Sequence, residues 1–158
     1  MTNRSREMHT PEFVGVFKKA GVDIVHLAEF HNRLGRGRRD PDKALPLLKL
    51  LHNECTRLSD DDFLLLPGEE PNVHLGGHWI SFFPRPVMWV LNRSKDKPFT
   101  EEHPEFGRVY HVGSPEDVLK LMEREGGLMW AAHPRIKSST GYPEDRKSTR
   151  LNSSHALI

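Results

Sequence analysis

The sequence has 158 residues, of which 36% are hydrophobic and 28% charged, a composition typical of a globular domain. No apolar stretch approaches the length of a membrane span and no signal peptide is visible, so a cytoplasmic location without membrane attachment is expected. The formal net charge of +1 gives no support for nucleic-acid binding. The single cysteine, Cys55, excludes an intramolecular disulfide and fits a reducing compartment.

The end of the chain differs in character from the rest. The run from Asp145 to His155 resembles the translation of a short-read sequencing adapter. We therefore expect residues 1–144 to form the domain and residues 145–158 to be a non-native tail. Without that tail the formal net charge is −1, because the segment carries three basic residues and one acidic residue.

The first elements of the chain read as a helix followed by a strand. Thr10-Pro11-Glu12 is typical of a helix start. Apolar residues at helical spacing follow it, and Gly21 ends this predicted helix. A short buried strand is predicted over residues 22–30, ending at His31. A loop rich in glycine and arginine is expected over residues 32–40.

The middle of the chain continues the alternation. An apolar stripe predicts a helix over residues 45–58, with Cys55 as a packed thiol rather than a nucleophile. Strands are predicted over residues 63–67 and 79–83. Residues 84–113 mix many prolines with charges, which predicts an irregular insertion.

The last elements repeat the order of helix and strand. Ser114-Pro115-Glu116-Asp117 predicts a helix start, and Gly126-Gly127 predicts its end. A final strand is expected over residues 128–132, with His133 directly after it. The alternation of helices and strands predicts an α/β fold with a mainly parallel sheet.

Four short segments combine a hydrophobic run with a side chain of the kind that binds metal ions. Three of these side chains follow predicted strands, and His78 stands at the start of one. In α/β folds the active-site residues lie at the carboxyl ends of the parallel strands. The four side chains are therefore expected to lie close together at that edge of the sheet. Imidazole and carboxylate together suit zinc, manganese or iron better than magnesium. The predicted metal ligands are His31, Glu70, His78 and His133.

The order of a histidine after an early strand, Gly68-x-Glu70, Gly77-His78 and His133-Pro134 resembles the polymerase and histidinol phosphatase (PHP) domain superfamily. The resemblance implies a distorted, TIM-like (β/α)7 barrel of parallel strands, present here in part. It also implies two or three divalent metal ions and a metal-activated water. That water would hydrolyse a phosphoester, or a related ester or amide bond, in a small-molecule substrate.

The family pattern is altered or missing in places. His31 matches a family histidine that usually follows Thr-Asp, whereas Glu29-Phe30 precede it here, and Glu70 matches the glutamate that bridges two metals. Of the family's early His-x-His pair the nearest candidate is His9, which stands alone, and its late Asp-x-His pair should lie beyond Glu144. These gaps predict a fragment truncated at both ends and inactive by itself.

Several alternatives stay open at this point. Glu69 could replace Glu70 as a ligand, and His74 could replace His78, while His26 is expected to lie in the core or to support the ligands. The remaining histidines of the middle region, His52, His103 and His111, are expected at the surface.

The function also has alternatives. Arg135 and Lys137 could hold an anionic group of the substrate, or could be solvated loop charges. Besides a hydrolase, the sequence allows a metal-binding domain without catalysis, similar to the PHP domains that serve as structural modules of polymerases. It also allows an α/β binding protein whose histidines are incidental.

Overall fold

A computed structural model describes residues 10–28, 40–70, 74–75 and 78–132 of the chain. These residues contain three helices, α1 (Glu12–Lys19), α2 (Pro41–Leu58) and α3 (Pro115–Glu125). Their strands are β1 (Ile24–His26), β2 (Leu64–Leu66), β3 (Gly68–Glu69), β4 (Trp79–Phe82), β5 (Met88–Val90), β6 (Thr100–His103), β7 (Gly107–His111) and β8 (Leu128–Ala131).

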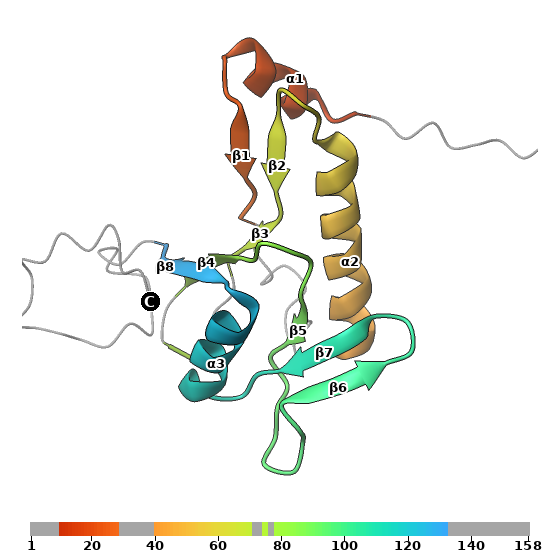
Figure 1. Cartoon of the computed structure of the whole chain (residues 1–158), viewed down its shortest axis with the longest axis vertical. Helices are drawn as coiled ribbons and strands as arrows, with labels where there is room; N and C mark the ends of the chain where they lie inside the picture. The colour runs from red at the N-terminus through yellow and green to blue at the C-terminus, as the bar shows by residue number, and fades with distance from the viewer. Residues whose placement is uncertain (1–9, 29–39, 71–73, 76–77, 133–158) are drawn as a thin grey trace, which may run out of the picture.

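The strands are arranged in three small sheets (Figure 1). β1 and β2 pair in parallel, β3, β4 and β8 form an antiparallel sheet in the order β3-β4-β8, and the third sheet has the order β5-β7-β6. In that third sheet β5 is parallel to β7 and β6 is antiparallel to it. The β1–β2 pair and α1 lie at one end of the molecule, and the β5-β7-β6 sheet lies at the other.

The predicted barrel of mainly parallel strands, a partial (β/α)7 fold, is wrong. Two of the three sheets contain antiparallel pairs, and the described residues contain only three helices. Parallel neighbours need a long crossover connection, usually a helix, and the short segment between β3 and β4 cannot provide one. The β1–α2–β2 unit has the predicted form, because α2 lies between two parallel strands in the chain.

The prediction of an irregular insertion over residues 84–113 is also wrong, because β5, β6 and β7 lie there. The charged strand Thr100–His103 has no buried residue, so its sequence lacks the apolar alternation that indicates a strand. By contrast, Trp89, Val90 and Tyr110 are almost completely buried. The sheet is therefore part of the core although its edge strand reads as a polar loop.

The helix ends follow local rules. Asp40 begins α2, because its Oδ1 accepts a hydrogen bond from the Asp42 amide at 3.2 Å and Pro41 follows as the first helical residue. The helix thus starts earlier than the predicted residue 45. The prediction for α3 is confirmed: Ser114 Oγ accepts a hydrogen bond from the Asp117 amide at 3.2 Å, and Gly126 ends the helix with φ 64°.

Helix α2 connects the parts of the core. Leu48 belongs to the cluster around Trp89, Cys55 to the cluster beneath α1, and Leu45 to the cluster with Val90 and Val109. One helix therefore contributes apolar side chains to each of the three described clusters. No helix among the described residues is long and apolar enough to cross a membrane.

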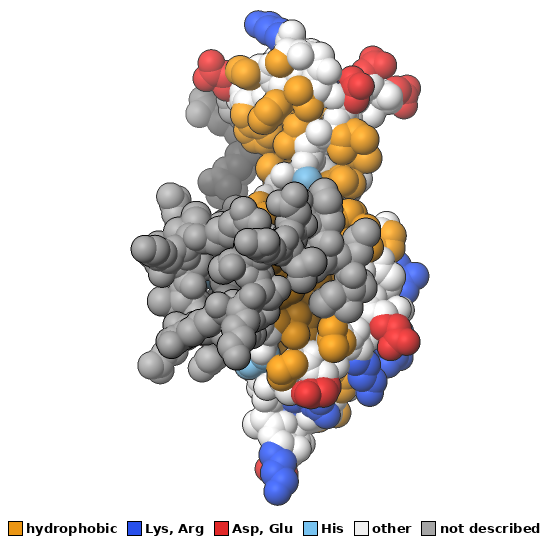
Figure 2. Space-filling view, turned by 90° about the vertical axis from the view of Figure 1, so that its left-hand side faces the viewer, with side chains coloured by type: hydrophobic (Ala, Val, Ile, Leu, Met, Phe, Trp, Pro, Cys, Tyr) orange, Lys and Arg blue, Asp and Glu red, His pale blue; other side chains and the backbone are white. Residues whose placement is uncertain are grey.

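Hydrophobic side chains are also exposed at one end of the molecule. Figure 2 shows them on the surface near α1 and β1, in its upper part. Val16, Ile24 and Leu64 are among the exposed large hydrophobic residues. Isolated residues of this kind are common on protein surfaces, so their presence alone indicates no partner.

The close approach of His26 to Gly68, where two sheets meet, provides a test of the fold. A Cβ atom on Gly68 would lie 1.7 Å from Nε2 of His26 and 2.3 Å from the carbonyl oxygen of Leu27. Gly68→Ala should therefore force β1 and β3 apart and lower the free energy of unfolding by about 1–3 kcal/mol. Chemical denaturation measures this change.

The matched control is Gly15→Ala in α1, where an added Cβ meets no atom within 4 Å. This substitution should stabilise the protein by about 0.5–1 kcal/mol, since alanine favours a helix over glycine. Equal denaturation midpoints for wild type and Gly68→Ala would contradict the described junction.

Candidate functional site

The structure brings two of the predicted ligands together. Glu70 directly follows β3, and His78 directly precedes β4. Because β3 and β4 are antiparallel, the carboxyl end of one lies beside the amino end of the other. Nδ1 of His78 lies 3.4 Å from Oε1 of Glu70. The two residues therefore meet although the parallel sheet from which their meeting was predicted does not exist.

The Glu70–His78 pair is only partly covered by the protein. The side chain of His78 is 21% exposed and that of Glu70 is 19% exposed. Such a position reduces hydration of the two groups while leaving a path for a small ion or molecule. A neutral imidazole and an ionised carboxylate at this separation can act as two ligands of one cation.

The neighbouring acid, Glu69, faces the other side of the sheet. Glu69 pairs with Ser81 in the β3–β4 register, and successive side chains of a strand point to opposite faces. Glu69 is 4% exposed, and its Oε2 accepts a hydrogen bond from Nε1 of Trp89 at 2.8 Å. The structure thus places Glu69 in the core and Glu70 at the accessible pair.

A small internal cavity lies on the core side of this sheet. It has a volume of about 10 Å³, and its lining includes His52, Glu69, Ser81 and Trp89. His52 is 7% exposed, so its expected place at the surface is wrong. The spacing of Leu48, His52 and Cys55 along α2 was the signal that could have placed His52 on the buried face.

His111 is the second histidine that sequence analysis misplaced. It is 2% exposed in β7, with Nδ1 2.7 Å from Oδ1 of Asn92 and Nε2 3.0 Å from Oε2 of Glu101. Burial, together with the charge of Lys97, lowers the pKa of His111 below its ordinary value despite the opposing effect of Glu101. Its neighbours are strand and loop residues of the same sheet, which gives it a structural role.

His26 lies where the first two sheets meet. Its ring packs against Phe82 and Trp130, with centroid separations of 4.9 and 5.3 Å. Gly68 pairs with Phe82, and Gly68 and Glu70 share one face of β3 by strand alternation. His26 therefore packs on the same face of the sheet as the Glu70–His78 pair, as a half-buried residue beside it.

Of the remaining candidate site residues, only His74 is among the described residues. His31, His133, Arg135 and Lys137 lie outside the described residues. His74, the alternative to His78, is described and exposed.

The chain just before His133 is described. The amide of Ala132 donates a hydrogen bond to the carbonyl oxygen of His78 at 3.0 Å, so β8 ends beside His78. The described residues contain no group of three His, Cys, Asp or Glu side chains that could hold a metal ion. Ligation by His31, Glu70, His78 and His133 stays a prediction.

Cys55 is a buried thiol, as predicted. It is 1% exposed within α2. Burial, with a smaller contribution from the charge of Glu54, raises its pKa to about 11. Since the thiolate is the reactive form, the environment of Cys55 disfavours nucleophilic chemistry.

Comparisons with known proteins do not identify the chain. A scan against models of protein families gives no match, and a search of curated proteins gives none either. The resemblance to PHP domains therefore stays a prediction that rests on the order of short motifs.

The packing of His26 predicts a dependence of stability on pH. Burial lowers the pKa of His26 below its ordinary value of 6.5, against a smaller opposing effect of the Ser81 backbone. The folded state thus prefers the neutral imidazole, and its contribution to stability is lost as the pH falls below 6.5. We expect wild type to lose stability between about pH 7 and about pH 5 more steeply than His26→Asn.

Unfolding by denaturant at a series of pH values measures this difference. The His26→Asn variant should also be less stable near neutral pH by about 1–3 kcal/mol, because it loses contacts to two aromatic rings. Parallel profiles of stability against pH for the two proteins would show that His26 does not titrate as described.

Proposed function

We propose that this chain binds a divalent transition-metal ion through Glu70 and His78 and serves metal-dependent hydrolysis of a phosphoester or a related ester or amide bond. The observation that carries the proposal is the 3.4 Å contact between Nδ1 of His78 and Oε1 of Glu70 at a partly exposed position. Zinc, manganese or iron suits this mixed nitrogen and oxygen donor set. His31 and His133 are the further ligands that the sequence pattern suggests.

The residues of the pair have distinct tasks in this proposal. His78 offers a ring nitrogen as a ligand only as a neutral imidazole, because metal coordination needs the lone pair of that nitrogen. Glu70 supplies the negative charge that offsets the charge of the cation. A divalent ion held there supplies an acidified water and polarises an oxygen of a small-molecule substrate.

The surroundings of the pair support this use. Phe82 and Trp130 form an aromatic contact on the face of the sheet that also carries Glu70, with ring centroids 5.9 Å apart. Apolar side chains beside a polar pair reduce access of water, which strengthens electrostatic interactions with a bound charge.

Metal binding by the full chain is the direct test. Titration with Zn²⁺ and Mn²⁺, followed by isothermal calorimetry and by elemental analysis after dialysis, should show saturable binding. Glu70→Gln and His78→Asn should each weaken the affinity at least about tenfold, because each removes one ligand of a site with few ligands.

Glu102→Gln and His103→Asn are matched controls. They make the same chemical changes in β6, outside the proposed site, and should leave the affinity unchanged. Equal affinities of wild type, Glu70→Gln and His78→Asn would overturn the proposed metal site.

Turnover separates a hydrolase from a metal-binding domain without catalysis. The metal-loaded chain is assayed with an aryl phosphate and an aryl ester. Hydrolysis that Glu70→Gln abolishes would support the hydrolase and would show that the expected inactivity of this chain by itself is wrong. Saturable metal binding without hydrolysis of either substrate would favour the metal-binding domain instead.

A further inference from the structure

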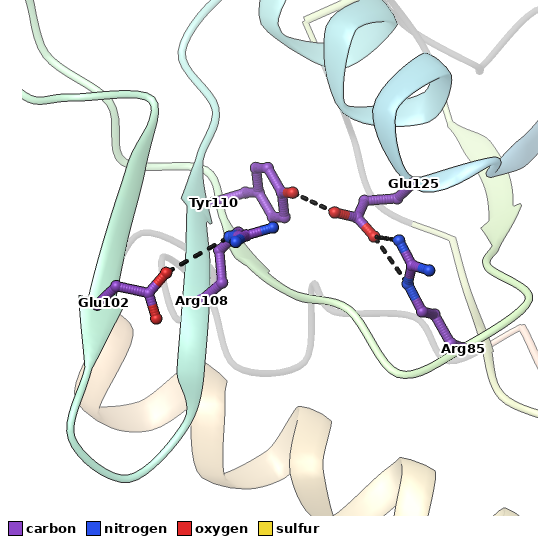
Figure 3. A network of polar contacts seen from close by, with 5 residues as sticks. All are labelled: Arg85, Glu102, Arg108, Tyr110 and Glu125. Atoms are coloured by element: carbon purple, nitrogen blue, oxygen red, sulfur yellow. Dashed lines mark hydrogen bonds and ion pairs between the residues drawn. The ribbon is translucent and has the colours of Figure 1, made fainter.

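A second polar region lies near the other end of β4 from His78, between α3 and the β5-β7-β6 sheet. The structure has a groove there with a volume of about 310 Å³, which is in the range of small-molecule sites. Arg85, Arg108 and Glu125 are its charged lining residues, and Met88, Phe106 and Tyr110 contribute apolar and aromatic surface. Figure 3 shows how the arginines, Tyr110 and Glu125 lie in this region.

Glu125 holds Arg85 in position. Nε and Nη2 of Arg85 both donate to Oε2 of Glu125, at 3.1 and 2.7 Å, and the Tyr110 hydroxyl donates to Oε1 (Figure 3). Burial alone would raise the pKa of Glu125, but the hydrogen bonds from Tyr110 and Arg85 outweigh it and lower the pKa. Glu125 therefore stays ionised, and both of its oxygens accept hydrogen bonds from the protein.

Arg85 is oriented but still accessible. Its side chain is 65% exposed, whereas that of Glu125 is 7% exposed. One oxygen of the Glu125 carboxylate accepts from Nε and Nη2, so a buried anchor fixes the orientation of a guanidinium that lines the groove and is largely exposed. This arrangement lowers the entropy cost of binding an anion to Arg85.

Arg108 supplies the second guanidinium. Its side chain is 51% exposed, and its Nε lies 3.4 Å from Oε1 of Glu102, whose side chain is 75% exposed (Figure 3). An ion pair with this geometry and exposure contributes little to stability, so a ligand can replace Glu102 at small cost.

The charges and apolar surface together define a class of ligand. The groove has two guanidinium groups and one carboxylate, which gives its lining a formal net charge of +1. We propose that it binds a small organic anion, a carboxylate or a phosphate monoester, whose apolar part lies against Met88 and Phe106. The proposal does not rest on the Glu70–His78 pair, which lies at the other end of β4.

Titration of the full chain with simple probes tests the proposal. Benzoate and phenyl phosphate are followed by amide chemical shifts in NMR, with benzamide as the neutral analogue and acetate and inorganic phosphate as anions without a ring. We expect saturable binding of benzoate or phenyl phosphate, at least about tenfold tighter than the corresponding analogues. Whichever of benzoate and phenyl phosphate binds more tightly shows whether the groove prefers a carboxylate or a phosphate ligand.

Substitutions then assign the binding to the groove. Arg108→Gln should weaken binding at least about tenfold, because one of the two cations is lost. The control is Arg57→Gln in α2, since Arg57 also pairs with a carboxylate, Glu54, but lies outside the groove; it should leave binding unchanged.

Arg85 needs a different variant, because Arg85→Gln would leave Glu125 buried without its cation. Arg85→Lys retains the charge and should fold, but it should bind benzoate or phenyl phosphate more weakly because it loses the planar fork. Affinities for both benzoate and phenyl phosphate that are no higher than that for benzamide, unchanged affinity in Arg108→Gln, or no saturable binding of either anion would each overturn the proposal.

Discussion

The antiparallel pairing of β3 with β4 sets the positions of Glu70 and His78, the two described residues of the candidate metal site. It places Glu69 opposite Ser81 and Gly68 opposite Phe82. Because side chains alternate along a strand, adjacent acids then point to opposite faces. Glu69 binds Trp89 in the core, and Glu70 meets His78. A shift of the register by one residue would exchange these roles and leave a carboxylate buried without its indole partner.

Strand β3 also lies where the β1–β2 pair meets the β3-β4-β8 sheet. Gly68 allows His26 to approach the β3 backbone, and the His26 ring then packs against Phe82 and Trp130. A residue with a side chain at position 68 would separate the two sheets, since its Cβ would overlap the imidazole. The packing of His26 against Phe82 and Trp130, beside the accessible polar pair, therefore depends on one glycine.

The charged side chains are arranged differently in the two candidate sites. At the Glu70–His78 pair, acid and base face each other directly in a partly exposed position. At the groove near α3, the buried carboxylate of Glu125 pairs with Arg85 and accepts a hydrogen bond from Tyr110, so it serves as an anchor for an exposed cation. The first arrangement suits a cation, whereas the second leaves a positive surface that suits an anion.

Local signals in the sequence determined the helices, because capping and apolar spacing act over a few residues. Ser114 and Gly126 mark the ends of α3. The sequence suggested Glu70 and His78 but left Glu69 and His74 open as alternatives, and the structure brings Glu70 to His78. The sequence did not determine the direction of the strands or the sheet that contains Thr100–His103, since main-chain hydrogen bonds between distant segments decide strand pairing. Only the tertiary structure placed Glu69 in the core against Trp89 and brought Arg85 to Glu125, because these contacts join elements far apart in the chain.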